Sequence, residues 1–331
     1  MQMKFSSIFQ ANFPFSPSRF PFFYGWCIVI FTTLGMIASI PGQTMGVGVY
    51  TDFLIQNSHL TRMQISMAYM TGTILSSLLL PLAGRYYDLV GARIMIVFAG
   101  IGMGISLLLF AELLTIIQLV HSLLPNISIL TSELLVITVV FLLLRQFGQG
   151  IMAMVSRNTL AKWFERRRGM VSGISGIFVA FSFSGAPLFM NIIIQDYGYS
   201  GSMVLMAIIL GFGMAFIGWL FFRDKPEDCG LLMDGDKITS LDTTNLFPEP
   251  ETTLKEALRT YNFWIFCLGL CSAAVIVTGL TFHISSIGAL AGLSRMEAYG
   301  LFLPMAVISV ISHFFEGWVL FLILIFFFLR L

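Results

Sequence analysis

Apolar stretches of about 20 residues, separated by short polar segments, recur along this chain. The hydrocarbon core of a bilayer is about 30 Å thick, and an α-helix needs about 20 residues to cross it. Lipid offers the backbone no hydrogen-bond partners, so such stretches satisfy their own backbone by forming helices. We therefore predict an all-α polytopic membrane protein, with eight spans near residues 23–50, 64–83, 94–117, 133–155, 170–194, 201–222, 262–283 and 297–315.

The composition agrees with these spans and argues against other kinds of protein. Hydrophobic residues make up 57% of the chain and charged residues only 11%, unlike an ordinary soluble domain. A net charge of +1 gives no reason to expect a nucleic-acid partner. The four cysteines are scattered, which fits neither a disulfide framework nor a zinc site. Without a phosphate-binding loop or a paired-histidine motif, we expect no metal, no cofactor and no enzymatic activity.

The basic residues predict how the chain is oriented. If the N-terminus is cytoplasmic, the outer loops hold only Arg62 and Arg295, and the other bases of the loops lie inside. Such an excess of Lys and Arg on one side is typical of the cytoplasmic face. We expect a multi-pass protein of the cell (inner) membrane with a cytoplasmic N-terminus.

One long polar segment divides the chain. Residues 223–260 contain several acids together with Pro226, Pro248 and Pro250, which favours a solvated cytoplasmic linker. We expect a cytoplasmic tail over residues 1–22 and a complete six-helix half over 23–222 before this linker. After it we expect the first two helices of a second half over 261–317 and an aberrant apolar tail over 318–331.

Two short segments repeat. Residues 60–64 (LTRMQ) and 293–297 (LSRME) match in type at every position, and each predicts a capping box at the start of a helix. The same separation leads from the first segment to Gly84 and from the second to Gly317, which indicates two related halves. Beyond Gly317 the residues are apolar and cannot form a charged turn. We expect the tail to be foreign sequence in a C-terminally truncated chain.

Residues 84–93 (GRYYDLVGAR) lie between the second and third spans. Two glycines, an acid and two bases predict a tight turn where the helices re-enter water, and we expect Asp88 to bind a helix N-terminus or to pair with Arg93. The spacing resembles the signature loop of the major facilitator superfamily. This resemblance implies a two-half secondary transporter, with Gly84, Arg85, Asp88, Gly91 and Arg93 acting in conformational gating. The alternative is an ordinary basic turn on the inner side.

Arg145 lies in the middle of the predicted fourth span. A charge at that depth costs about 3 kcal/mol or more, so the side chain should face a water-filled cavity or a partner. A guanidinium in a cavity can bind a carboxylate through two hydrogen bonds. Arg145 with Gly148 and Gly150 is also similar to the fourth-span motif of the superfamily, displaced by one residue. We predict a substrate-binding or proton-coupling role; the alternative is a purely structural buried pair.

Other polar residues are weaker candidates for substrate binding or proton coupling. Pro41 interrupts the first span just before Gln43 and Thr44, and discontinuous helices often present polar groups to cargo, although a packing kink explains the pattern equally well. Tyr69 lies in the second span. His283, at the end of the seventh span, can titrate near neutral pH, or it is an ordinary interfacial histidine.

A basic stretch follows the fourth span. Bases beside a membrane fix topology and attract anionic lipid at about 1 kcal/mol per residue, which requires no substrate. We expect anionic lipid as a partner of four residues there, namely Lys162, Arg166, Arg167 and Arg168.

Further motifs resemble one branch of the superfamily. They are YGW at 24–26, KWF at 162–164, PEDCGL at 226–231 and FH at 282–283, and they are similar to the oxalate/formate antiporters and monocarboxylate porters. The resemblance implies a small-molecule anionic substrate, a mono- or dicarboxylate, moved by alternating access in exchange or with a proton. The competing hypothesis is a non-transporting truncated relic or membrane scaffold, because alternating access needs both halves.

Overall fold

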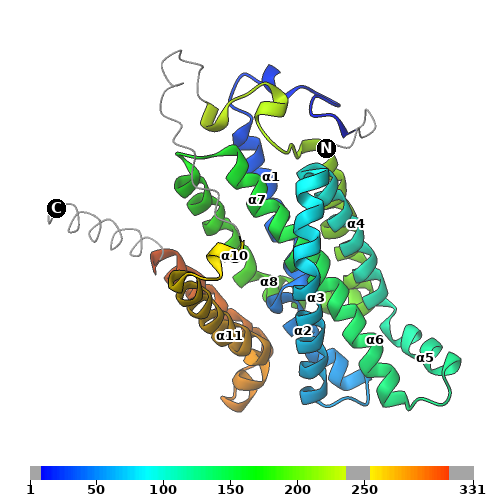
Figure 1. Cartoon of the computed structure of the whole chain (residues 1–331). Coiled ribbons are helices and arrows are strands. Elements are labelled where there is room, and N and C mark those ends of the chain that lie inside the picture. The colour runs from blue at the N-terminus through cyan, green and yellow to red at the C-terminus, as the bar shows by residue number, and fades with distance from the viewer. Residues whose placement is uncertain (1–8, 236–253, 313–331) are drawn as a thin grey trace.

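The computed structural model describes residues 9–235 and 254–312, and its long elements are all helices (Figure 1). Two π-helical segments, Arg145–Met152 and Ala207–Phe212, continue α6 into α7 and α8 into α9. In chain order the α-helices are α1 (Gly25–Ala38), α2 (Thr44–Asn57), α3 (Arg62–Val90), α4 (Ala92–Ala111), α5 (Leu113–Leu123), α6 (Ile129–Leu144), α7 (Ala153–Trp163), α8 (Arg168–Met206), α9 (Gly213–Phe221), α10 (Leu254–Ala257), α11 (Tyr261–Leu290) and α12 (Arg295–Gly300).

Within the described residues, six helical stretches are long and apolar enough to cross a membrane. The prediction of an all-α polytopic membrane protein is confirmed. One stretch, Arg168–Phe221, has 54 residues, more than a single crossing needs. Its backbone leaves the helical region at Gly198, where φ is 71°, so it divides into two spans near the predicted fifth and sixth. The other five are Arg62–Val90, Ala92–Ala111, Ile129–Trp163, Tyr261–Leu290 and Arg295–Ser312.

The first predicted span is broken in the middle. α1 ends at Ala38, a 3₁₀ turn covers Ile40–Gly42, and α2 begins at Thr44. The interruption at Pro41 follows from its missing N–H group. Gly42 packs directly on the backbone of α6, because an added Cβ there would lie 2.2 Å from the carbonyl oxygen of Leu144. The break is therefore held against the residue that precedes Arg145.

The third predicted span is shorter than expected. α4 ends at Ala111, and the backbone turns at Glu112 (φ −97°, ψ 20°) before α5 begins. α5 packs along α6 and buries Leu113 and Ile117 (Figure 1). The expected continuation of the third span to residue 117 is wrong, because these residues belong to a separate helix.

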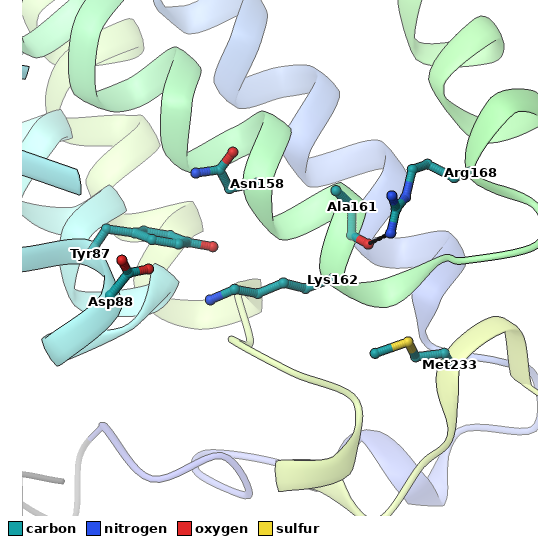
Figure 2. A pocket seen from close by; sticks show the side chains of 7 residues that line it. All are labelled: Tyr87, Asp88, Asn158, Ala161, Lys162, Arg168 and Met233. Carbon is teal, nitrogen blue, oxygen red and sulfur yellow. Dashed lines mark hydrogen bonds between the residues drawn. The ribbon is translucent and has the colours of Figure 1, made fainter. Parts of the chain in front are cut away.

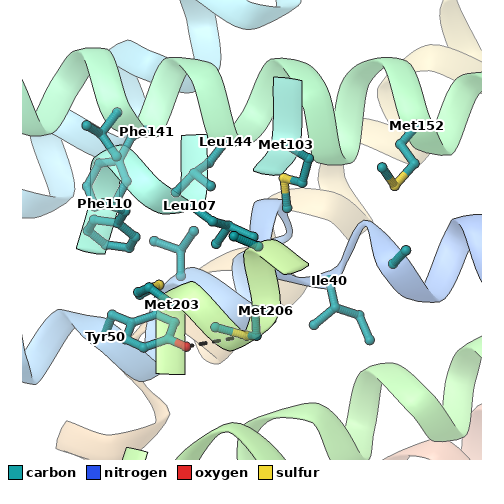
Figure 3. Close-up of a cluster of buried hydrophobic side chains, with 14 of the residues drawn as sticks. Ile40, Tyr50, Met103, Leu107, Phe110, Phe141, Leu144, Met152, Met203 and Met206 are labelled. Atoms are coloured by element: carbon teal, nitrogen blue, oxygen red, sulfur yellow. Dashed lines mark hydrogen bonds between the residues drawn. The ribbon is translucent and has the colours of Figure 1, made fainter. Parts of the chain in front are cut away.

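Residues 25–221, called the main bundle below, share a hydrophobic core (Figure 3). Tyr50, Met103, Phe141 and Met206 are buried there from four different helices, and the Tyr50 hydroxyl donates to the Met206 sulfur at 3.6 Å. Methionine side chains are flexible and fill irregular gaps, which suits a core formed by bent and interrupted helices.

Residues 261–312, called the α11–α12 unit below, lie against the main bundle. α11 packs on α2 and α12 packs on α8, and Figure 1 shows α11 beside the bundle. Capping boxes are present at both predicted places, with Thr61 and Gln64 before α3 and Ser294 and Glu297 before α12. The repeated segments thus start helices in the same way. Gly317 and the tail over 318–331 lie outside the described residues.

The linker is not solvated along its whole length. Arg223, Cys229 and Asp234 are 1%, 3% and 4% exposed, so residues 223–235 fold against the main bundle. Residues 236–253 of the predicted linker are outside the part of the chain that the structure describes.

Candidate functional site

Arg145 lies deep within the longest uninterrupted helical run of the main bundle. That run, Ile129–Trp163, places Arg145 about 24 Å from its first residue and about 27 Å from its last at 1.5 Å per residue. The side chain is 8% exposed. Arg145 begins the π-helical segment, a local distortion that is frequent at functional sites. The position of Arg145 near the middle of a span, expected from the sequence, is confirmed.

The guanidinium of Arg145 contacts two other elements. Its Nη1 donates a long hydrogen bond of 3.4 Å to the carbonyl oxygen of Gly42, in the break of the first span. Its Cζ lies 5.2 Å from the centre of the Tyr69 ring of α3, a cation–π distance. Close backbone packing fixes the first contact, since a Cβ added to Gly148 would lie 2.9 Å from the Cα of Gly42.

No carboxylate pairs with Arg145 among the described residues, where every salt bridge within 4.0 Å involves other side chains. No nitrogen of Arg145 is among the described side-chain atoms that are both fully buried and without a hydrogen-bond partner. The N–H groups that lack a protein partner therefore retain some exposed surface. A guanidinium with such free N–H groups can bind an anionic group by donating hydrogen bonds to it.

Of the weaker candidates, Tyr69 lies beside Arg145 and Thr44 contacts Tyr69. The Thr44 and Tyr69 hydroxyls share a hydrogen bond of 2.9 Å. Gln43 turns back instead, because its Nε2 donates to the Ser39 hydroxyl at 3.0 Å. The broken first span thus brings Thr44 into the cluster with Arg145 and Tyr69, while Gln43 helps to close the break.

His283 reaches this cluster only through its neighbour Phe282. The Phe282 ring stacks on Tyr69, with centroids 5.1 Å apart and an interplanar angle of 23°. The His283 ring meets Phe282 edge-on, with centroids 5.4 Å apart, and is half-buried. We call Arg145, Thr44, Tyr69 and Phe282 the Arg145 cluster. The sequence marks Phe282 only as part of the FH motif and not as a site residue, because one phenylalanine among 33 says nothing about which side chain it contacts.

The predicted gating segment is mainly helical, unlike the ten-residue turn that we expected. Gly84, Arg85 and Asp88 belong to the last turns of α3, and the turn itself is Gly91, with φ at 82°. An L-residue with a side chain rarely adopts this φ, so glycine is required there. Arg85 and Asp88 are exposed.

The predicted pairing of Asp88 with Arg93 is wrong. Arg93 is 5% exposed, and it donates to the carbonyl oxygens of Trp219 at 2.6 Å and Gln10 at 2.9 Å. Asp224 takes the helix-capping role that we expected of Asp88, because it accepts from the Ala92 N–H at 3.0 Å. A short-range pattern in the sequence could not reveal a partner 132 residues away.

A pocket of about 370 Å³ adjoins the end of α3 (Figure 2). Asp88 of the gating segment lines it together with Lys162 and Arg168 of the basic stretch. Lys162 donates to Asp224 at 2.9 Å and lies 4.2 Å from the centre of the Tyr87 ring. The remaining lining residues are Tyr87, Asn158, Ala161 and Met233.

The basic stretch is held by Asp234 of the linker. The Asp234 carboxylate accepts from the main-chain N–H groups of Glu165, Arg166 and Arg167 at 2.9–3.1 Å. Burial alone would raise the pKa of Asp234, but these three donors and the Arg166 charge outweigh it, so the pKa lies below its usual value. The Arg168 guanidinium donates to the carbonyl oxygens of Phe164 and Ala161. Its charge therefore stays uncompensated by these bonds.

In the described part of the chain, no group of three or more His, Cys, Asp and Glu residues could hold a metal ion. Burial raises the pKa of the Cys229 thiol to about 11, more than the nearby Arg223 lowers it. This thiol is therefore protonated at neutral pH and is a poor metal ligand.

Comparison with known proteins gives one result. The family model described as "Major Facilitator Superfamily" matches residues 27–329, more than nine-tenths of the chain. No curated protein matches the chain.

Proposed function

The chain belongs to the major facilitator superfamily and is a multi-pass secondary transporter, and we propose that its cargo is a small organic anion. The proposed class is a mono- or dicarboxylate, moved by alternating access in exchange or together with a proton. Arg145 binds the carboxylate, and Tyr69, whose ring lies against the guanidinium, and Thr44, which is hydrogen-bonded to Tyr69, are the proposed neighbours of the same cargo.

One observation carries this proposal. Arg145 is buried near the middle of a span without a carboxylate within 4.0 Å among the described residues. A buried cation without a counter-charge is costly, and an anionic cargo supplies the missing charge when it binds. A neutral cargo would leave that cost in place.

We further propose that the end of the bundle containing Gly91 faces the cytoplasm. The N-terminus of the chain then lies on the cytoplasmic side of the cell membrane. Arg85, Arg93, Arg157 and the basic stretch all lie toward this end. The positive-inside rule supports this orientation. In that orientation, the α3–α4 turn acts as a gating element on the inner side.

Anionic lipid is the proposed partner of the basic stretch. Lys162 is partly neutralised by Asp224, whereas Arg168 bonds only to carbonyl oxygens in the described contacts. A phosphate beside the pocket would complete the charge balance of Arg168. Arg166 and Arg167 extend the same positive surface.

Uptake into proteoliposomes tests the cargo. Labelled oxalate, formate or lactate is supplied with an unlabelled anion inside, or with an imposed pH gradient. We expect Arg145→Ala to lower kcat/KM at least tenfold, since a lost charged hydrogen bond is worth about 1.5–3 kcal/mol. Arg157→Ala is the matched control, because this arginine is exposed on the same helical run. Equal uptake by wild type and Arg145→Ala removes Arg145 from the mechanism, and no uptake of any anion favours a non-transporting scaffold.

A further inference from the structure

α11 is attached to the main bundle over a short part of its length. Its buried residues are Thr281, Phe282, Ile284 and Gly288, all in its second half. Most apolar side chains in its first half are exposed, and Phe266, for example, is 73% exposed. The position of α11 therefore depends on what these few residues contact.

The attachment point on α2, Gly48, lies one turn from Thr44 of the Arg145 cluster. A Cβ added to Gly48 of α2 would lie 3.4 Å from the Thr281 carbonyl oxygen and 3.8 Å from the Phe282 Cα. The two backbones are thus in close contact. Thr44, four residues before Gly48, lies on the same face of α2 and bonds to Tyr69.

Phe282 extends from this contact into the cluster. It is 5% exposed, and its ring stacks on Tyr69 at 5.1 Å. Tyr69 in turn lies against the Arg145 guanidinium and is 6% exposed. Phe282 therefore links the α11–α12 unit to Arg145 through Tyr69.

We propose that Phe282 is a positioning residue for the anion site, acting through Tyr69. While α11 is docked, the stacked Phe282 ring fixes Tyr69 against the guanidinium. When α11 moves with its unit, Tyr69 loses this support and Arg145 is no longer held in one orientation. The affinity for the anion then differs between two arrangements of the unit, which is what couples binding to movement. This inference rests on the proposed anion transport.

The main test separates stacking from mere apolar bulk. Phe282→Leu keeps an apolar side chain without a ring, and Phe282→Tyr keeps the ring. In the uptake assay we expect Phe282→Leu to raise KM about three- to tenfold, because the loss of one aromatic pair weakens binding by about that factor. The change in kcat should be smaller. Phe282→Tyr should restore KM to within twofold of wild type. Phe266→Leu, on the exposed face of the same helix, should leave both constants unchanged.

A double-variant cycle tests whether the effect passes through Tyr69. If it does, Phe282→Leu combined with Tyr69→Leu should have the same KM as Tyr69→Leu alone, whereas independent effects would multiply. Multiplied effects overturn the proposal. Phe282→Met replaces the leucine variant if that variant does not purify as a single species.

A second measurement needs no transported substrate. Phenylglyoxal modifies accessible arginines, and mass spectrometry of the Arg145 peptide gives the rate of reaction. We expect a severalfold faster reaction of Arg145 in Phe282→Leu than in wild type or Phe266→Leu. If this rate rises although no anion is transported, the positioning role stands and the proposed cargo falls. An unchanged rate and an unchanged KM overturn the positioning role.

Discussion

The two ends of the main bundle use charge in different ways. The linker end is formed by residues 91–93 and 162–168 together with the adjoining residues 10–23 and 223–235. The far end is formed by residues 52–62 and 128–133 together with residues 293–297 of the α11–α12 unit. At the linker end, the buried Arg93 and Arg223 donate to main-chain carbonyl oxygens, while Asp224 and Asp234 accept from main-chain N–H groups and Asp224 also pairs with Lys162.

At the far end, charged side chains pair mainly with one another. Asp52 pairs with both Arg62 and Arg295, and Glu133 bonds to the ring and accepts from the main-chain N–H of His59. Arg62 and Arg295 occupy the same place in the two repeated segments. Because Asp52 belongs to the main bundle and Arg295 to the α11–α12 unit, the Asp52 carboxylate bridges the two.

The difference separates a fixed end from an adjustable one. Main-chain groups cannot move away from a buried charge without unfolding the segment that carries them, so their loss is costly. Partly exposed ion pairs contribute little to stability and exchange their partners easily. The linker end is therefore expected to behave as one rigid body, and the far end is where the α11–α12 unit can detach.

The largest effect is expected at Arg223, which is 1% exposed. Its guanidinium donates to carbonyl oxygens of two separate segments, near the N-terminus and at the end of α9: Ala11, Phe13, Phe15, Leu220 and Phe222. Arg223→Ala leaves these acceptors without their donor and should destabilise the protein by about 3 kcal/mol or more. Thermal unfolding in detergent measures the change. Arg19→Ala is the control, because Arg19 is exposed at the same end; similar unfolding temperatures for both variants would contradict a rigid linker end.

A smaller effect, with a characteristic pH dependence, is expected at Asp234. This residue has φ at 59°, which asparagine tolerates, so Asp234→Asn removes the charge without straining the backbone. We expect a loss of about 1–2 kcal/mol at pH 7, because three charged hydrogen bonds become weaker ones or are lost.

The sign of the pH dependence follows from the lowered pKa of Asp234 in the folded protein. Its stabilising contribution is complete above the unfolded value of about 3.9 and disappears as the pH falls through the lower folded pKa. The difference between wild type and Asp234→Asn should therefore be constant from pH 7 to pH 5 and shrink below about pH 4. Asp228→Asn, at an exposed acid of the same linker, should show no such difference. If the stability difference between wild type and Asp234→Asn persists at the lowest pH, it arises from the shape of the side chain and not from its charge.

The sequence predicts the helices and the Arg145 cluster better than it predicts the linker end. Apolar stretches of the right length give the spans, Pro41 gives the break, and the two capping boxes follow from hydroxyl and Gln or Glu spacing. These are local patterns. Arg145 is identified because a charge in a span needs a reason, and Thr44 and Tyr69 are polar residues within spans.

The partners at the linker end could not be predicted in this way. Arg223 contacts carbonyl oxygens more than 200 residues away, and any residue has a carbonyl oxygen, so no side-chain pattern marks the acceptor. Asp224 and Asp234 lie in a segment whose acids and prolines indicate solvent exposure. Asp88 is close to Ala92 and Arg93 in sequence, whereas Asp224, the acid that caps Ala92, is 132 residues away. The fold brings Asp224, and not Asp88, to the start of α4.

The smallest effect is expected at the far end, where the comparison can be made sharper. Asp52→Asn weakens the bonds to Arg62 and Arg295, whose side chains are 31% and 46% exposed. Partly exposed ion pairs are worth about 0–1 kcal/mol, so the unfolding temperature should change little. Because salt screens exposed charges, any difference from wild type should be largest at low ionic strength and nearly absent at high ionic strength.

Replacing the two arginines one at a time shows which part of the protein each bond stabilises. Arg62 and Asp52 both belong to the main bundle, whereas Arg295 belongs to the α11–α12 unit. Arg295→Gln should therefore increase the protease sensitivity of the loop between α11 and α12 more than Arg62→Gln does, although both remove one partner of the same carboxylate. Equal protection of that loop in the two variants would mean that Phe282 and its neighbours hold the unit without Asp52. A large fall in unfolding temperature for Arg295→Gln would mean that the far end is as rigid as the linker end, because only a buried, unreplaced charge contact costs several kcal/mol to remove.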